Sequence, residues 1–182
     1  MPGIRLAILT AIAAFALIGG DAQARVWRPT PVEQISDYLF IVDPRPDGSQ
    51  VMVYWIAPQI AEDREDQAKL RAWTRGHLLF AIAEVDIKDG SSLMPRRVAD
   101  PDISIGNRKR RVIEQGQFNP DLQRAVDHAR EIIGHAGQAF RFFAVTEPNL
   151  GACSVGSVQV RYERETYSYR MPAPGCSQAP PR

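Results

Sequence analysis

The sequence has little cysteine, no large net charge and no long apolar run beyond its first 20 residues. Its 22 basic and 21 acidic residues leave a formal net charge of +1 at pH 7. A near-neutral chain is not drawn to nucleic acid by its overall charge, so we expect no nucleic-acid partner. The sequence also lacks a complete catalytic or cofactor-binding motif. We therefore expect no cofactor.

The first 24 residues have the three parts of a secretory signal peptide. A basic start at residues 1–5 precedes a charge-free apolar run at residues 6–20, and Ala22-Gln23-Ala24 supplies the small residues that signal peptidase recognises. The alternative is an uncleaved membrane anchor, but the run has 15 residues, whereas a spanning helix needs about 20. We expect cleavage after Ala24, no transmembrane segment after cleavage, and a periplasmic or secreted protein.

The 158 residues that would remain after cleavage are enough for one ordinary domain. We find no repeat or linker, and predict a single globular domain over residues 25–176 with a disordered tail at 177–182. The two cysteines, Cys153 and Cys176, both lie in this domain. In an oxidising compartment an even pair predicts a disulfide, and their spacing excludes a C-x-x-C redox site.

The order of helical and extended segments predicts an α+β fold. Runs rich in β-forming residues at 38–42 and 51–56 flank a turn-forming segment, which is typical of a hairpin. Helices are predicted at 59–75 and 120–136, the second with Asn119 as its N-cap. With hairpins near both ends and only two helices, we expect a mostly antiparallel sheet built from hairpins, with the two helices packed on one face.

The middle of the chain contains the strand that we expect to be central. Residues 78–87 are apolar on both faces for most of their length, which indicates a strand with neighbours on both sides. Residues 88–101 have the composition of a loop. Residues 103–105 are predicted to pair with 111–113 around a Gly-Asn turn, and 138–146 contain a further strand.

Alternating residues near the C-terminus predict a second hairpin with a definite register. Folding the chain about the bond between residues 164 and 165 places three apolar pairs on one face. The same register brings Cys153 opposite Cys176, beyond the last ladder pair. The predicted pairs are Val158 with Met171, Val160 with Tyr169, and Tyr162 with Tyr167.

Two groups of side chains have the composition of a catalytic or metal site. Glu84 and Asp86 share one face near the end of the central strand, and paired carboxylates can act as general acid and base. The alternative is the charged end of a strand that reaches solvent. His128, Glu131 and His135 lie within an arc of about 60° on the second helix and are ordinary zinc ligands. That arc is opposite the apolar stripe, so we favour a solvated helix face without metal.

Arg108, Lys109, Arg110 and Arg111 form a dense run of charge. Outside the cytoplasm such a run suits an acidic partner or an anionic surface, and the alternative is a solvated loop. We expect an exported envelope protein that is a binding or interaction module rather than an enzyme, with another envelope protein or an anionic surface as its partner. The alternative is a small extracytoplasmic hydrolase that uses Glu84 and Asp86.

Overall fold

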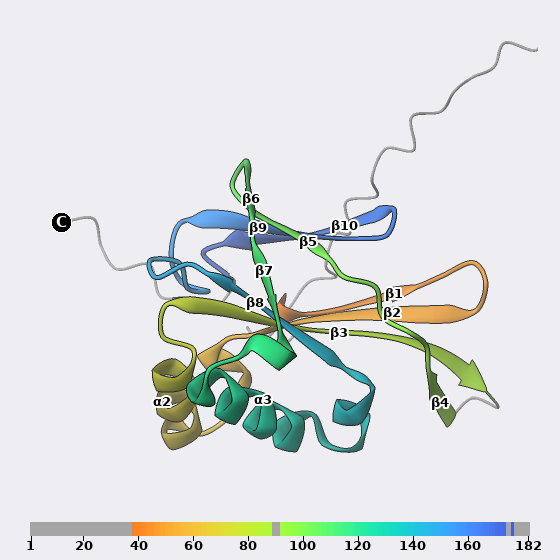
Figure 1. The fold of residues 1–182 in the computed structure, drawn as a ribbon, viewed down its shortest axis with the longest axis horizontal. Helices are drawn as coiled ribbons and strands as arrows, with labels where there is room; N and C mark the ends of the chain where they lie inside the picture. The colour runs from red at the N-terminus through yellow and green to blue at the C-terminus, as the bar shows by residue number, and fades with distance from the viewer. Residues whose placement is uncertain (1–37, 89–91, 174–175, 177–182) are drawn as a thin grey trace, which may run out of the picture.

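The protein folds into three layers, seen here in a computed structural model that describes residues 38–88, 92–173 and Cys176. A four-stranded sheet lies on one face of a six-stranded sheet, and two helices cover the other face (Figure 1). Every strand pairing that the structure describes is antiparallel. The predicted α+β fold with both helices on one face is therefore confirmed. The predicted signal peptide and tail lie outside the described residues.

The six-stranded sheet has β3 at its centre. Residues 79–83 of this strand have no exposed surface, which confirms the prediction made from its two apolar faces. The prediction of a loop at 88–101 is wrong in part, because the chain turns back and pairs residues 92–95 with the end of β3. In spatial order the strands are β1 (Phe40–Pro44), β2 (Ser49–Ile56), β3 (His77–Lys88), β8 (Arg141–Thr146) and β7 (Val112–Glu114), with β4 (Ser92–Pro95) also paired to β3.

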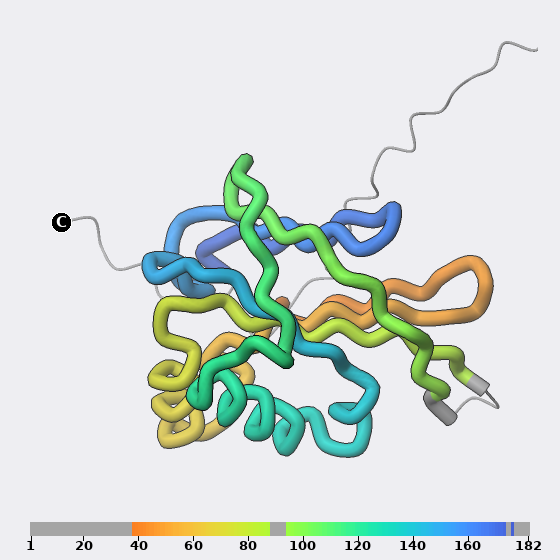
Figure 2. Tube along the Cα trace, in the orientation of Figure 1, coloured from red at the N-terminus to blue at the C-terminus, as the bar shows by residue number. Residues whose placement is uncertain are grey.

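In the four-stranded sheet, one predicted strand pairing is wrong. The residues that pair with 103–105 are 108–110 and not 111–113, because a two-residue turn at Gly106 and Asn107 places Ile105 directly opposite Arg108. The chain then leaves this sheet and enters the other one as β7, as the green part of the tube in Figure 2 shows. The strands, in spatial order, are β10 (Glu165–Met171), β9 (Gly156–Tyr162), β5 (Asp102–Ile105) and β6 (Arg108–Arg110).

The β9–β10 hairpin has a register two residues away from the predicted one. Its two-residue turn, at Glu163 and Arg164, makes Tyr162 and Glu165 the closing pair, and two-residue turns are the favoured hairpin connections. A slip of two residues keeps each side chain on the same face. All six side chains that were predicted to share a face are accordingly buried: Val158, Val160, Tyr162, Tyr167, Tyr169 and Met171.

Aromatic side chains fill the space between the two sheets. The fully buried ring of Tyr169 lies 5.6 Å from that of Trp55 and 6.2 Å from that of Phe80, measured between centroids. Its hydroxyl donates a hydrogen bond of 3.1 Å to the carbonyl oxygen of Val53. The phenol of β10 thus fills the core while its polar atom has a partner on β2, as a buried phenol requires.

The helices begin where side chains cap them. The predicted helix 59–75 is divided into a 3-10 helix, η1 (Pro58–Ile60), and α2 (Arg64–Trp73), because Asp63 accepts a hydrogen bond of 2.8 Å from the backbone nitrogen of Asp66 and starts a new helix. Within the described part of the chain, no helix has the length and apolar composition needed to cross a membrane.

The second helix, α3 (Pro120–Ile133), starts as predicted but ends earlier. The Asn119 side chain accepts a hydrogen bond of 2.8 Å from the backbone nitrogen of Leu122. Gly134 has a φ of +72° and ends the helix three residues before the predicted end. The chain continues as the 3-10 helix η3 (Gly134–Ala139), and another 3-10 helix, η2 (Gln115–Gln117), precedes α3.

Candidate functional site

The structure brings Glu84 and Asp86 together on one cation, Arg96. The Arg96 guanidinium lies 3.3 Å from Oε1 of Glu84 and 2.6 Å from Oδ1 of Asp86. It also lies 2.8 Å from Oδ2 of Asp47, in the turn between β1 and β2. The second oxygen of Glu84 accepts a hydrogen bond of 2.8 Å from the Tyr162 hydroxyl. Three carboxylates therefore share one guanidinium at the edge of the space between the sheets.

The electrostatics of this cluster favour ion pairing. Hydrogen bonds from Ser49 and then Arg96 hold the pKa of Asp47 well below its usual range, and the carboxylates raise the pKa of Arg96. Burial, and then the bond to Glu84, raise the pKa of Tyr162 to about 12. The cluster connects the β1–β2 turn, β3 and β9 through the ion pairs of Arg96 and the hydrogen bond from Tyr162.

Two of the three predicted metal ligands, His128 and Glu131, are in contact, but the set is not brought together as a site. His128 packs edge-on against Trp73 of α2, with ring centroids 5.6 Å apart, and its side chain is only 13% exposed. The expectation that His128 faces water is therefore wrong, because α2 covers that side of α3. Glu131 lies 3.3 Å from Nδ1 of His128, whereas His135 is exposed in η3. The described residues contain no cluster of three or more side chains able to hold a metal ion.

The run from Arg108 to Arg111 is divided between paired and unpaired cations. The Lys109 ammonium lies 2.6 Å from a carboxylate oxygen of Asp102, and the Arg110 guanidinium lies 2.6 Å from one of Glu147. Arg108 and Arg111 have no ion-pair partner among the described residues. Arg110 and Arg111 line an open hollow of about 620 Å³, which we call the arginine hollow; its other lining residues are Ile113, Gln117 and Thr146.

The predicted disulfide between Cys153 and Cys176 is present, with 5.4 Å between the two Cα atoms. Both cysteines lie beyond the β9–β10 ladder, which ends where Gly156 pairs with Met171. The backbone nitrogen of Ala173 donates a hydrogen bond of 2.8 Å to the carbonyl oxygen of Ala152. This bond brings the two segments together next to the cysteines, so the disulfide forms despite the shifted register.

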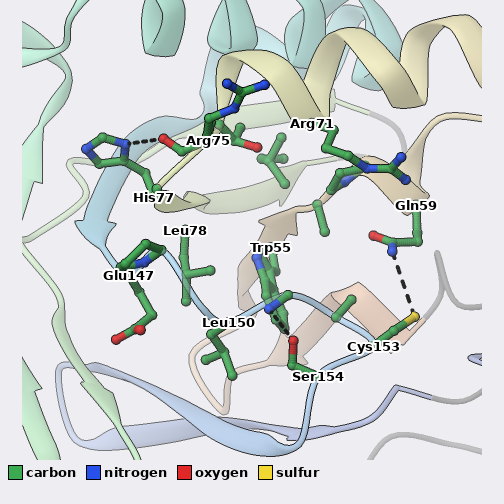
Figure 3. Close-up of a pocket in the computed structure, with 18 residues that line it drawn as sticks. Trp55, Gln59, Arg71, Arg75, His77, Leu78, Glu147, Leu150, Cys153 and Ser154 are labelled. Carbon is green, nitrogen blue, oxygen red and sulfur yellow. Dashed lines mark hydrogen bonds between the residues drawn. The ribbon is translucent and has the colours of Figure 1, made fainter. Parts of the chain in front are cut away.

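A pocket that sequence reasoning missed lies beside this disulfide (Figure 3). It has a volume of about 510 Å³, and we call it the disulfide pocket. Its lining comes from the end of β2, the end of α2, the start of β3 and the chain between β8 and β9. The residues that define it here are Trp55, Leu78 and Leu150, which are apolar, Arg71 and Arg75, which are cationic, and Cys153.

Local backbone structure positions the two arginines. The Thr74 hydroxyl donates a hydrogen bond of 2.7 Å to the carbonyl oxygen of Leu70 at the end of α2, and Gly76 then turns the chain into β3 with a φ of +79°. Arg71 and Arg75 thus lie at a helix C-terminus, where the helix dipole stabilises positive charge. In the sequence, the signal for this site is a cationic helix end followed by glycine. That signal does not show which part of the chain forms the opposite wall of the pocket.

The charge of the disulfide pocket is positive. Arg71 and Arg75 have no acidic partner among the described residues, and the one acidic residue in the described lining, Glu147, is engaged by Arg110. Figure 3 shows Arg71 near Gln59 on one side of the pocket, with His77 and Glu147 on the other. Such a site can hold an anionic group at its rim while an apolar group contacts its base.

No family model matches the chain, and no curated protein and no solved structure matches it either. The function is therefore inferred from the side chains themselves.

Proposed function

We propose that the chain is an exported, non-enzymatic binding protein whose disulfide pocket holds an anionic group of its ligand. The observation that carries the proposal is the pair of unpartnered arginines, Arg71 and Arg75, at a pocket of about 510 Å³ with an apolar base. Pockets that bind small ligands have volumes of about 300–1,000 Å³ and combine apolar walls with a few polar groups. The expected partners, another envelope protein or an anionic surface, carry such anionic groups.

Export is supported by the disulfide and by the pattern of the first 24 residues, because structural disulfides persist in oxidising compartments. We propose that the mature chain begins at Arg25 in the periplasm or outside the cell. Mass spectrometry of the protein recovered from the extracytoplasmic fraction should find an N-terminal peptide that starts at Arg25. A peptide that retains Met1 would contradict cleavage.

The contacts of Glu84 and Asp86 favour binding over hydrolysis. Both carboxylates are bound to Arg96, and a general acid or base must exchange a proton with substrate. They also lie at the opposite end of β3 from the disulfide pocket, because the six residue steps from Leu78 to Glu84 span about 20 Å of extended strand. A hydrolase at these carboxylates would therefore have to displace Arg96 and would not use the disulfide pocket.

The anion site can be tested with one small probe and its neutral analogue. N-acetylphenylalanine has one carboxylate and one apolar side chain, and its amide has the same shape without the charge. The acid should bind more tightly in calorimetry or in NMR titration. The double variant Arg71→Gln/Arg75→Gln should weaken binding of the acid by roughly tenfold, which corresponds to about 1.4 kcal/mol.

A matched control separates this site from general charge effects. Arg64 lies on the same helix and is exposed, but it does not line the pocket. Arg64→Gln should leave the affinity for the acid unchanged. Equal affinity for acid and amide, or an equal loss in the Arg64 variant, would contradict the proposed function.

A further inference from the structure

The two cysteines of the disulfide have different surroundings. Cys153 is exposed and lines the disulfide pocket. Cys176 is half-buried, packs against the core and does not belong to the described lining of the pocket. A molecule held in the disulfide pocket therefore meets one residue of the pair, Cys153.

Gln59 contacts the sulfur of Cys153 from the opposite segment of the lining. Its Nε2 donates a weak hydrogen bond of 3.9 Å to Sγ of Cys153. Gln59 belongs to η1, whereas Cys153 belongs to the chain between β8 and β9. Figure 3 shows this contact as a dashed line, with Arg71 on the same side of the pocket. The sulfur thus lies in the wall that η1 helps to form.

The packing of α2 beside η1 brings the charge of Arg71 to this wall. Gln67, one helical turn before Arg71 and on the same face of α2, donates a hydrogen bond of 3.0 Å to the carbonyl oxygen of Ala61, which directly follows η1. Arg71 and Cys153 both line the disulfide pocket. An unpaired cation and an exposed disulfide sulfur therefore share one pocket and one wall.

We propose that Cys153 is a site of thiol–disulfide exchange with small thiols that carry a carboxylate. The attraction of the carboxylate to Arg71 rests on the proposed function, and the reaction at Cys153 is new. Exchange begins when a thiolate attacks one sulfur of a disulfide, and its rate depends on which sulfur is accessible. Of the two cysteines, Cys153 is the one that a ligand in the pocket can reach.

The exchange step transfers one S–S bond and consumes no other reagent. The thiolate of the ligand forms a bond to Sγ of Cys153, and the bond between Cys153 and Cys176 breaks. The electron pair of that bond leaves with Sγ of Cys176, and the resulting thiolate takes a proton from water. Sγ of Cys176 already lies 3.6 Å from the carbonyl oxygen of Ala152, which can accept a hydrogen bond from the new thiol. The acidic ligand is then held covalently in the pocket, and attack by Cys176 on the mixed disulfide reverses the step.

The test uses mercaptoacetate and its neutral analogue mercaptoacetamide, each in excess over the processed protein with its disulfide intact. Samples are quenched with N-ethylmaleimide at intervals, and mass spectrometry follows the loss of the disulfide. The two thiols differ in intrinsic reactivity, but this difference is the same for every variant of the protein. A change in the ratio of the two rate constants, acid over amide, therefore measures the effect of the substituted charge.

Two variants of α2 separate Arg71 from general charge effects. Arg71→Gln should lower the ratio roughly threefold at about 0.15 M salt, as expected for the loss of one exposed ion pair. Arg64→Gln is the matched control, because Arg64 lies outside the pocket and about 10 Å from Arg71 along the helix axis. Charges more than about 8 Å apart are largely screened at this salt concentration, so this variant should leave the ratio unchanged.

Peptide mapping of the quenched samples identifies the sulfur that is attacked. We expect the mixed disulfide on Cys153 and the maleimide on Cys176. The inference is overturned if the mixed disulfide forms on Cys176, if the folded protein does not react, or if Arg71→Gln leaves the ratio unchanged.

Binding of N-acetylphenylalanine tests the proposed function independently, because that probe has no thiol. If its binding depends on Arg71 and Arg75 while the ratio does not depend on Arg71, the exchange reaction alone is rejected. If its binding is insensitive to both arginines, the proposed function itself fails.

Discussion

The hydroxyl of Tyr162 donates a hydrogen bond of 2.8 Å to Oε2 of Glu84, and this bond joins the two sheets. A second phenol repeats the connection, because the Tyr167 hydroxyl donates a hydrogen bond of 2.9 Å to Oδ2 of Asp43 on β1. Both bonds are buried. The tyrosines of the β9–β10 hairpin thus supply both apolar rings and polar contacts to the layer beneath.

Tyr162→Phe should destabilise the fold, because it leaves a buried carboxylate oxygen of Glu84 without its donor. We expect the free energy of unfolding to fall by about 1–3 kcal/mol, measured by urea denaturation. Glu84→Gln and the double variant complete a cycle that isolates the contact. A coupling energy of at least about 0.5 kcal/mol is expected, and strictly additive effects would show that the bond does not stabilise the fold.

The hydrogen bonds to Asp47 predict a loss of stability in acid. Because Ser49 and then Arg96 hold the folded-state pKa of Asp47 below its usual range, its contribution is fully present above the unfolded value of about 3.9. This contribution to stability is lost as the pH falls from the unfolded-state pKa of Asp47 through its lower folded-state pKa. Urea midpoints measured downward from pH 5 should therefore decline less steeply in Asp47→Asn than in the native chain. If the urea midpoints of the variant and of the native chain decline equally as the pH falls, Asp47 is not the source of this acid sensitivity.

The β9–β10 turn offers a stabilising substitution. Glu163 has a φ of +54°, a left-handed conformation that a residue other than glycine adopts at a cost of about 1–2 kcal/mol and that asparagine tolerates better. Glu163→Asn should raise the free energy of unfolding by about 0.5 kcal/mol, a part of that cost. Its neighbour Arg164 is not in this conformation, so Arg164→Asn should give no gain. Equal effects at both positions would reject the explanation.

Sequence alternation predicted which faces are buried, but not how strands align. The pattern at Val158, Val160 and Tyr162 identifies the buried face of β9 in either register, since a slip of two residues preserves the face. The register depends on whether the turn contains two residues or four, and Glu163 and Arg164 are not typical turn residues. The central position of β3 was predictable because two apolar faces require two covering layers.

The contacts of the sites depend on distant parts of the chain. Glu84 was predictable as a polar group at the end of a strand, but its cation, Arg96, follows a strand that the sequence did not indicate. The disulfide pocket is still harder to predict from the sequence, because four segments between residues 55 and 154 contribute to its lining. Nothing in the local pattern of Arg71 and Arg75 indicates that the chain around Leu150 lies across from them.

His128, within α3, and His135, in η3, should have unequal effects on stability. His128 packs against Trp73 between the helices, whereas His135 is exposed. His128→Ala should lower the free energy of unfolding by about 1 kcal/mol, the usual contribution of an aromatic pair. His135→Ala should change it by less than about 0.5 kcal/mol, as is usual at the surface. Thermal unfolding with and without Zn²⁺ provides the check, because a shared metal site would make both histidines necessary for a zinc-induced rise in Tm.

The disulfide should stabilise both the fold and the disulfide pocket. It closes a loop between cysteines 23 positions apart, for which loop-closure entropy gives about 3 kcal/mol. Cys153→Ser/Cys176→Ser should lower the free energy of unfolding by about that amount, and reductant should lower the stability of the native chain to the same level while leaving the variant unchanged. Because Cys153 lines the pocket, the variant should also bind N-acetylphenylalanine less tightly under conditions where circular dichroism shows it folded. Undiminished affinity in the folded variant would mean that other contacts, such as the hydrogen bond from the backbone nitrogen of Glu147 to the carbonyl oxygen of Gly76, suffice to hold this wall in place.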